Sequence, residues 1–212
     1  MVRFTIDGVR VEAQEGEKLL WAALAAGIYI PHLCANREAN HPFSGCRLCF
    51  VEIEGQDQPV TSCTETVADG LVVSTDTPAV RRLQRTAAEL LLASHDVDCA
   101  HCEVHRKCPL QEMAAFLHIG LKPKHLRNIP RPFPTESINS VLAYNSGRCV
   151  RCGLCIWVCN EKVGAGIIDF AFRGFRTVVA SLETTEVMQS ICPSCTQCVQ
   201  VCPVAALKLN SD

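Results

Sequence analysis

The chain has 212 residues, of which 48% are hydrophobic and 20% charged, and its formal net charge is −2. This balance argues against a nucleic-acid-binding protein, which would carry a strongly basic face. Fifteen residues are cysteine, and because that number is odd they cannot all pair as disulfides within one chain. No secretory leader is visible, and the longest apolar run, Leu19 to Pro31, is too short to span a bilayer. We therefore expect a cytoplasmic protein with reduced thiols and no membrane insertion.

Residues 1–77 have the pattern of a small α+β domain. Apolar residues alternate at Val2, Phe4 and Ile6, and Asp7-Gly8 separates them from a second alternating stretch, which is a strong signal for a β-hairpin. The stretch from Leu19 to Ala26 predicts a short helix that ends at Gly27. Three further strands are predicted, at residues 48–53, 59–64 and 71–74.

This first domain contains four cysteines with the spacing C-x11-C-x2-C-x13-C, namely Cys34, Cys46, Cys49 and Cys63. Four thiolates on the loop-rich side of a β-grasp-like sheet suit a [2Fe–2S] cluster. Gly45 has no side chain, so we expect it to let the backbone approach that cluster closely. A four-cysteine zinc site is the alternative that the local spacing leaves open.

Residues 78–120 predict a helical domain. Thr77 is a candidate cap and Pro78 suits the first position of a helix. The apolar residues expected on the buried face of this helix are Val80, Leu83, Ala87, Leu90 and Leu91. A second helix is predicted from Pro109 to Leu117, with Leu110 and Met113 on its apolar face and Gly120 as its end.

Between these helices lies the motif H-x3-C-x2-C-x5-C, formed by His95, Cys99, Cys102 and Cys108. Three thiolates leave a [4Fe–4S] cluster one ligand short, and the nearby imidazole of His95 would supply the fourth. A neutral imidazole in place of a thiolate makes the site less negative, which raises its potential when other factors are equal. His101 and His105 are rival ligands by proximity.

Residues 121–143 carry four prolines and several basic residues and predict a connector. Residues 144–212 then contain the spacing C-x2-C-x2-C-x3-C twice, with a small hairpin predicted at residues 164–179. Three cysteines on a tight loop would hold one [4Fe–4S] cluster, and the fourth, at the start of a departing helix, would reach the other cluster. The two predicted ligand sets are Cys149, Cys152, Cys155 with Cys202, and Cys192, Cys195, Cys198 with Cys159.

The doubled motif resembles that of bacterial two-cluster ferredoxins, although Asn160 replaces the proline that usually follows the first run. The four proposed sites use all fifteen cysteines, which supports assigning them jointly. One [2Fe–2S] and three [4Fe–4S] clusters would contain about fourteen iron atoms.

The stretch Ser44-Gly45-Cys46-Arg47-Leu48-Cys49 resembles the amino-terminal domain of the large iron–sulfur subunit of respiratory complex I. The H-x3-C-x2-C-x5-C motif is the signature of a His-ligated [4Fe–4S] centre in that subunit and in iron hydrogenases. Over nearly all 212 residues, the order of sites resembles the diaphorase small iron–sulfur subunit of bidirectional NAD-reducing nickel–iron hydrogenases. The fold expected is α+β: a β-grasp [2Fe–2S] domain, a helical segment with a His-ligated cluster, and a two-cluster ferredoxin-like domain.

The resemblance implies an electron-transfer subunit that works inside an enzyme complex catalysing H2 + NAD⁺ ⇌ H⁺ + NADH. Its partners would be an FMN- and NAD-binding diaphorase subunit and the hydrogenase small and large subunits, which would hold the FMN, NAD and nickel–iron centre. No catalytic residue is evident in this chain, and neither G-x-G-x-x-G after a strand nor a P-loop occurs. The alternatives are an electron-transfer subunit of an NAD-linked formate dehydrogenase or complex I-like assembly and, more remotely, a zinc-binding or redox-sensing scaffold.

Overall fold

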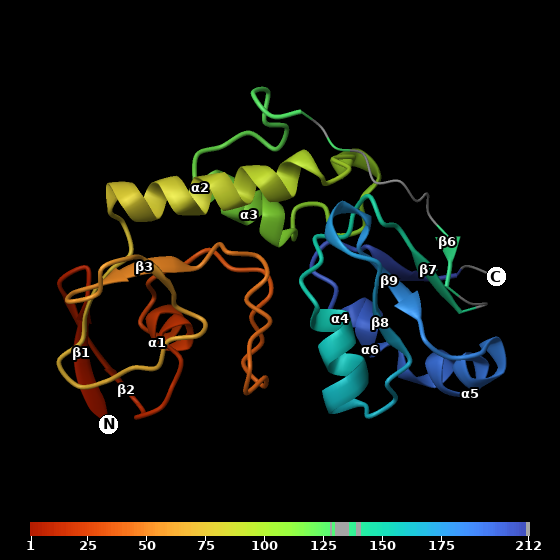
Figure 1. Cartoon of the computed structure of the whole chain (residues 1–212), viewed down its shortest axis with the longest axis horizontal. Helices are drawn as coiled ribbons and strands as arrows, with labels where there is room; N and C mark the ends of the chain where they lie inside the picture. The colour runs from red at the N-terminus through yellow and green to blue at the C-terminus, as the bar shows by residue number, and fades with distance from the viewer. Residues whose placement is uncertain (128, 130–135, 139–140, 211–212) are drawn as a thin grey trace. The chain divides into compact units, whose positions relative to one another are not determined.

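The computed structural model describes residues 1–127, 129, 136–138 and 141–210 (Figure 1). They form two compact units, Met1–Glu89 with Met113–Ile119, and Leu90–Glu112 with the remainder from Gly120. Much of the predicted connector, at residues 128, 130–135 and 139–140, lies outside the described residues, and the four-part domain division stays a prediction.

The first unit contains a five-stranded sheet in the order β2-β1-β5-β3-β4. Its strands are β1 (Val2–Ile6), β2 (Val9–Ala13), β3 (Phe50–Ile53), β4 (Val60–Thr61) and β5 (Val72–Ser74). β1 pairs antiparallel with β2 and parallel with β5, as expected for a β-grasp sheet. Asp7 and Gly8 have φ angles of 50° and 79°, so the predicted hairpin is confirmed with both turn residues left-handed. β3 begins two residues later than predicted because Leu48 and Cys49 belong to the cysteine loop.

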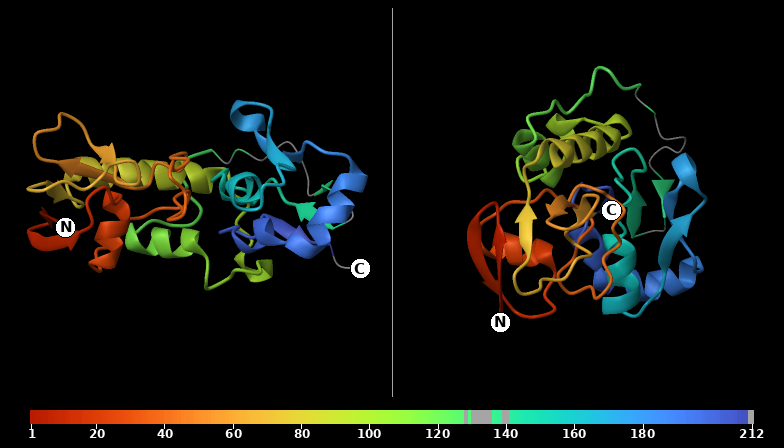
Figure 2. Two further views of the ribbon diagram at one scale, coloured as in Figure 1. Left: turned by 90° about the horizontal axis from the view of Figure 1, so that it is seen from below. Right: turned by 60° about the vertical axis from the view of Figure 1, so that its left-hand side comes forward.

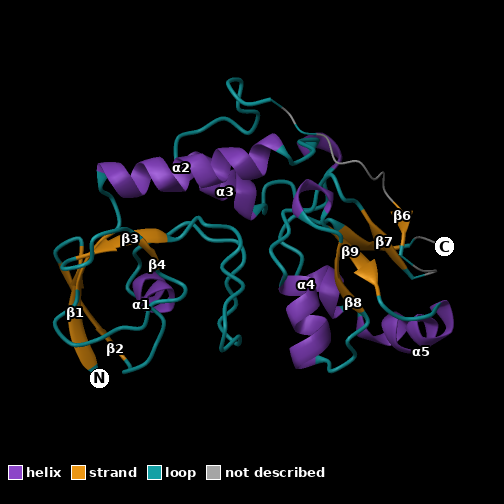
Figure 3. Ribbon diagram, in the orientation of Figure 1, coloured by secondary structure: helices purple, strands orange, loops and turns teal. Residues whose placement is uncertain are grey.

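Helix α1 (Leu19–Ala25) packs against the sheet and contributes to the core of this unit (Figure 3). Leu19 and Leu20 are fully buried in one apolar cluster with residues of β1, β2, β3 and β5. The helix ends before Gly27, whose φ of 77° is a conformation that costs glycine little. The predicted helix is thus confirmed, and the chain continues from its end to Cys34, the first cysteine.

Helix α2 (Pro78–Ala93) begins as predicted, because the Thr77 side chain accepts a hydrogen bond from the Val80 N–H at 3.2 Å. Its buried face differs from the prediction, since Leu90 is 58% exposed whereas Gln84 is buried. The Gln84 side-chain amide donates to the Phe50 carbonyl at 2.9 Å. A polar residue therefore takes a core position because β3 offers its amide an acceptor.

Helix α3 (Pro109–Phe116) buries Leu110, Met113 and Leu117, so the predicted apolar face is confirmed. The chain turns at His118, which has a φ of 52°, two residues before the predicted end at Gly120. A short 3-10 turn, η1 (Cys99–His101), lies between α2 and α3.

The second unit contains a three-stranded sheet in the order β10-β7-β6 and a separate two-stranded hairpin (Figure 2). The strands are β6 (Glu136–Ser137), β7 (Leu142–Tyr144), β8 (Ile168–Ala171), β9 (Val178–Ser181) and β10 (Leu207–Leu209). The helical segments are α4 (Leu154–Trp157), η2 (Val158–Lys162), η3 (Gly174–Arg176), α5 (Thr185–Cys195) and α6 (Gln197–Gln200). Antiparallel pairing of β8 with β9 confirms the hairpin predicted between the two cysteine runs. In the part of the chain that the structure describes, no helix is both long enough and apolar enough to cross a membrane.

Candidate functional site

The four cysteines of the first unit are buried and lie near one another, although they come from two loops, one before β3 and one after β4. The Cys34 thiol donates to the Cys46 sulfur, with the two Sγ atoms 3.3 Å apart. This hydrogen bond, which stabilises the thiolate, holds the pKa of Cys46 at about 6. Cys49 donates to Cys63 in the same way and lowers the pKa of Cys63 to about 7.

The pKa of both donors, Cys34 and Cys49, is raised by the hydrogen bond that each donates, then by burial and by the negative charge of the partner cysteine. Four such thiols would repel one another as thiolates unless a cationic group lay among them. Soft thiolate donors in this number fit an iron–sulfur cluster by their chemistry.

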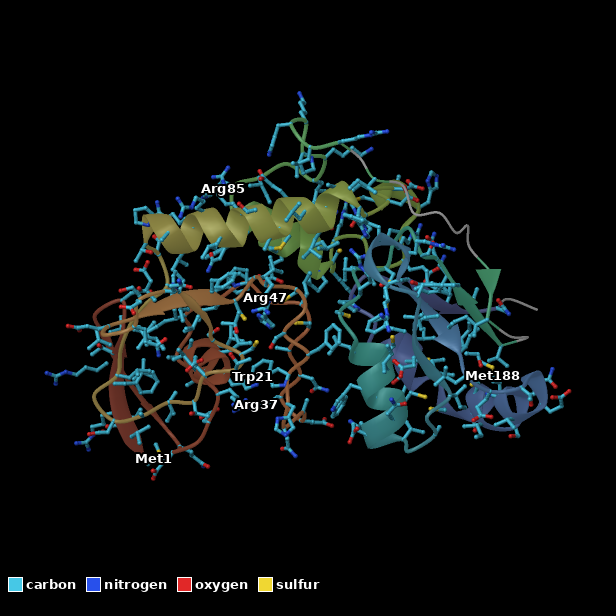
Figure 4. All side chains as sticks on the ribbon, in the orientation of Figure 1. Met1, Trp21, Arg37, Arg47, Arg85 and Met188 are labelled. Carbon is cyan, nitrogen blue, oxygen red and sulfur yellow. The ribbon has the colours of Figure 1, made fainter. Side chains whose placement is uncertain are left out.

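Two residues of the loop that carries Cys46 and Cys49 have left-handed backbone conformations, which residues with a side chain rarely adopt. Ser44 and Arg47 have φ angles of 55° and 54°, and Arg47 is labelled in Figure 4. The turn directs the Cys46 N–H to the Cys34 sulfur at 3.4 Å, and the Ser44 hydroxyl lies 3.6 Å from the Cys63 sulfur. A Cβ on Gly45 would lie 2.6 Å from the Phe43 ring. The structure therefore gives the nearby Phe43 ring as a reason for Gly45, and the predicted approach to a cluster stays a prediction.

The second group consists of Cys99, Cys102 and Cys108. Burial raises the pKa of Cys108, and the charges of Cys102 and Cys99 raise it further, which places the three thiols within electrostatic reach of one another. The backbone N–H groups of Leu110 and Gln111, in the first turn of α3, act in the opposite direction and lower this pKa. A helix N-terminus of this kind stabilises a thiolate.

His95 has the tautomer that a metal ligand needs. Its Nδ1 lies 2.9 Å from the carbonyl oxygen of Arg148. Because a carbonyl only accepts, Nδ1 must carry the proton, and the lone pair of the neutral ring is on Nε2. The hydrogen bond thus orients His95 as a ligand through Nε2, although its role as fourth ligand stays a prediction.

The rival histidines fit less well. The His105 Nδ1 lies 3.3 Å from the side-chain nitrogen of Gln111, whose oxygen accepts from the Arg106 N–H at 3.0 Å. That arrangement makes Nδ1 of His105 an acceptor and places the proton of the neutral ring on Nε2. His101 also has an Nδ1 that pairs with an acceptor, the Asp98 carboxylate at 2.9 Å, and so a lone pair on Nε2, but its side chain is exposed.

The eight remaining cysteines line two pockets. One pocket is lined by Cys149, Cys152, Cys155 and Cys202 together with Phe170, Val179 and other apolar residues. The other is lined by Cys159, Cys192, Cys195 and Cys198 together with Ile168, Ile191 and other apolar residues. Each pocket combines three cysteines of one run with the fourth cysteine of the other run, which is the grouping predicted from the spacing.

The electrostatics of these thiols follow the same grouping. Burial raises the pKa of Cys155 well above its ordinary value, followed by the charges of Cys152, Cys149 and Cys202 and, last, by the charge of Cys198 from the other pocket. Burial likewise raises the pKa of Cys198 to about 12, with further contributions from Cys159, Cys192 and Cys195. The grouping supports the predicted ligand sets, which stay a prediction.

Backbone N–H groups point at the sulfurs of both pockets. The donors and their sulfur acceptors are Arg151 N–H to Cys149 at 3.3 Å, Ile167 N–H to Cys159 at 3.4 Å and Ala206 N–H to Cys202 at 3.2 Å. Arg151 and Thr196, each inside a cysteine run, are left-handed, with φ angles of 55° and 49°. Donors of this kind stabilise negative charge on sulfur and are one of the determinants of cluster potential.

The local structure of the two runs differs from the prediction. Cys155 lies in α4 and Cys159 in η2, so in the first run only Cys149 and Cys152 lie on a loop. In the second run Cys192 lies in α5, and Cys202 follows α6 rather than starting a helix. The predicted tight loops and departing helices are therefore wrong in detail, because short helical turns bring the cysteines together instead.

Among the described residues, no three His, Cys, Asp or Glu side chains are grouped so that they could hold a single metal ion.

Sequence reasoning also missed one residue beside the sites. Arg148 precedes Cys149 and is buried, and nothing in the sequence distinguishes it from an ordinary surface arginine.

Two family models match parts of this chain. A family model described as "2Fe-2S iron-sulfur cluster binding domain" matches residues 1–78, and "NADH-ubiquinone oxidoreductase-G iron-sulfur binding region" matches residues 84–121. One relative, a NADH-quinone oxidoreductase subunit of Rhizobium meliloti, is 35% identical over 98% of this chain. Another, the NADP-reducing hydrogenase subunit HndD of Solidesulfovibrio fructosivorans, is 34% identical over 98% of it. The chain spans only 24% and 36% of these two relatives.

A solved structure gives a match over nearly the full length of both chains. It is a chain from NAD⁺-reducing [NiFe]-hydrogenase in the H2-reduced state, with a TM-score of 0.85 and 29% identity. The match covers 99% of this chain and 88% of that one. The resemblance predicted from the cysteine spacing is therefore confirmed: the chain contains regions that match iron–sulfur-binding domains, and it is similar to a chain of NAD⁺-reducing [NiFe]-hydrogenase and to NADH-quinone oxidoreductase subunits.

Proposed function

We propose that this chain is the electron-transfer subunit of an NAD-linked nickel–iron hydrogenase and holds one [2Fe–2S] and three [4Fe–4S] clusters. The observation that carries the proposal is the grouping of the last eight cysteines into two pockets, each built from both runs. The match to a chain of NAD⁺-reducing [NiFe]-hydrogenase, which extends over 88% of that chain, supports the choice of complex.

Bound clusters of this type take up and release single electrons. The protein's part is to hold them and to set their environment. Buried thiolates supply the ligands, N–H donors from Arg151, Ile167 and Ala206 stabilise negative charge on sulfur, and apolar walls keep water away.

The proposed partners are a diaphorase subunit that binds FMN and NAD and the hydrogenase small and large subunits. A flavin exchanges electron pairs with NAD(H) and single electrons with iron–sulfur centres, so it would connect this chain to the nicotinamide. The [2Fe–2S] and His95 sites would lie toward the flavin, and the paired sites toward the hydrogenase. The whole would then catalyse H2 + NAD⁺ ⇌ H⁺ + NADH.

An electron-transfer role in a complex I-like or formate-oxidising assembly is the second candidate. It is favoured by the 35% identity to the NADH-quinone oxidoreductase relative of Rhizobium meliloti, although this chain spans only 24% of that protein. Partner metals separate the candidates, because copurification with nickel and flavin supports the hydrogenase and copurification with molybdenum supports the formate assembly.

The variant Cys198→Ser in the native complex tests the proposed function and the order of sites. We expect it to block H2-driven reduction of NAD⁺ while NADH-driven dye reduction continues, since the lost ligand belongs to the paired sites. Ser194→Ala is the matched control, because this exposed serine lies in the same run but does not line the pocket. Loss of dye reduction in a folded, assembled Cys198→Ser complex would contradict the order.

A further inference from the structure

Arg148 is held in place between two segments of the second unit. Its N–H donates to the Asn145 side-chain oxygen at 3.1 Å, and its carbonyl accepts from His95 Nδ1 at 2.9 Å. The Asp96 N–H donates to the Gly147 carbonyl at 2.8 Å, so residues 95–96 and 147–148 run along each other. The backbone of Arg148 is thus fixed against the segment that carries His95.

The side chain of Arg148 is buried, with 7% of its surface exposed. Its Nη2 donates to the carbonyl of His101 at 3.1 Å, which places the guanidinium at the turn between Cys99 and Cys102. Its Nε and Nη1 atoms are fully buried and have no hydrogen-bond partner among the described residues. Because a guanidinium stays protonated in proteins, three N–H groups of a buried cation, one on Nε and two on Nη1, lack an acceptor.

Nearby protein groups do not supply that acceptor. The carboxylate of Asp98 lies within electrostatic reach of Arg148 but pairs with the exposed His101 ring. Glu103, which directly follows Cys102, forms an ion pair with Lys208 at 2.6 Å. A buried cation with unused donors, held at the turn between Cys99 and Cys102, indicates that an anionic group completes the site.

We propose that Arg148 is a positioning residue for the His95 site, whose guanidinium donates Nε–H and Nη1–H to sulfur atoms of the anionic cluster held by Cys99, Cys102 and Cys108. This rests on the proposed function, since it requires an iron–sulfur cluster there. The same residue orients His95 through its carbonyl, so one position acts on both the ligand and the charge of the site. A cation beside the cluster stabilises its reduced, more negative form and raises its reduction potential.

The test is a redox titration of the native complex, followed by EPR, with Arg148→Met and Arg148→Lys. Methionine keeps much of the volume and removes the charge, whereas lysine keeps the charge but loses the Nε donor and the planar fork. Arg106→Met is the matched control, because Arg106 is an exposed arginine in the loop between Cys102 and Cys108. Iron content and the remaining EPR signals are measured in parallel.

In Arg148→Met we expect the reduction equilibrium constant of the His95 cluster to fall at least tenfold, which is 59 mV for one electron. Arg148→Lys should lie between this variant and the wild type, and Arg106→Met should change the constant less than twofold. Selective loss of iron from the His95 site in both Arg148 variants would also support the proposal, because the site would then need the guanidinium to assemble.

The proposal is overturned if the loaded Arg148→Met cluster shifts no more than the Arg106→Met cluster, because Arg148 would then be structural only. Loss of iron from all sites in both Arg148 variants would also overturn it, as a general folding defect. If the wild-type complex itself contains zinc in place of iron, the proposed function fails first, and iron content distinguishes that outcome.

Discussion

Replacing Cys202 by alanine tests the crossed grouping of the two cysteine runs. Cys202 is close in sequence to Cys198, yet it lines the pocket of Cys149, Cys152 and Cys155. The substitution removes one of four thiolates from that pocket, together with the acceptor of the Ala206 N–H, which lies 3.2 Å from the Cys202 sulfur. We therefore expect the damage to appear in the site of the first run.

The size of the effect follows from the ligand count. Complete loss of the affected cluster would remove about four of about fourteen iron atoms, and retention as a three-iron form would remove about one. The other pocket keeps Cys159, Cys192, Cys195 and Cys198 and should keep its full iron content.

The assay is iron analysis with EPR of the reduced protein, in which Cys202→Ala is compared with Cys155→Ala and Cys192→Ala. Cys202→Ala should alter the same signal as Cys155→Ala and leave the signal altered by Cys192→Ala intact. Ser194→Ala should leave all signals unchanged. If Cys202→Ala and Cys192→Ala remove the same signal, the crossed grouping is wrong.

Three further predictions concern the helices and the His95 site. Thr77→Ala removes the cap of α2 and should lower the free energy of unfolding by about 1 kcal/mol, so an unchanged denaturation midpoint would count against the cap. Met113→Ala leaves a cavity at a fully buried position and should cost about 2–5 kcal/mol in the same measurement, whereas a cost under about 1 kcal/mol would mean that the site collapses freely. His95→Cys should keep the cluster but lower its potential, because a thiolate adds negative charge; an unchanged potential, or an equal shift in His101→Ala, would argue against His95 as ligand.

Local patterns in the sequence predicted much of the fold. The alternation of apolar residues around Asp7-Gly8 predicted the β1–β2 hairpin, and the apolar run that ends before Gly27 predicted α1. The spacing of the eight last cysteines also predicted the grouping that the two pockets display. These features depend on neighbours close in sequence or on ligand spacing, which a single sequence records.

The features that were missed depend on contacts between distant residues. Gln84 is buried in place of Leu90 because the carbonyl of Phe50, 34 residues away, accepts from its amide. Strand β7 was not predicted because its three residues become a strand by pairing with β10 near the other end of the unit. Arg148 is held by hydrogen bonds with His95 and His101, which are about 50 residues away. No short-range pattern in the sequence predicts such a contact.

We propose that this chain holds about fourteen iron atoms in clusters and conducts electrons between a flavin subunit and a nickel hydrogenase. The most direct test is anaerobic metal and flavin analysis of the native complex that copurifies with this chain, with EPR of the chain itself. We expect iron clusters on this chain and nickel and flavin on its partners. Zinc in place of iron would contradict the electron-transfer role, and iron here with molybdenum in the partners would contradict the hydrogenase assignment.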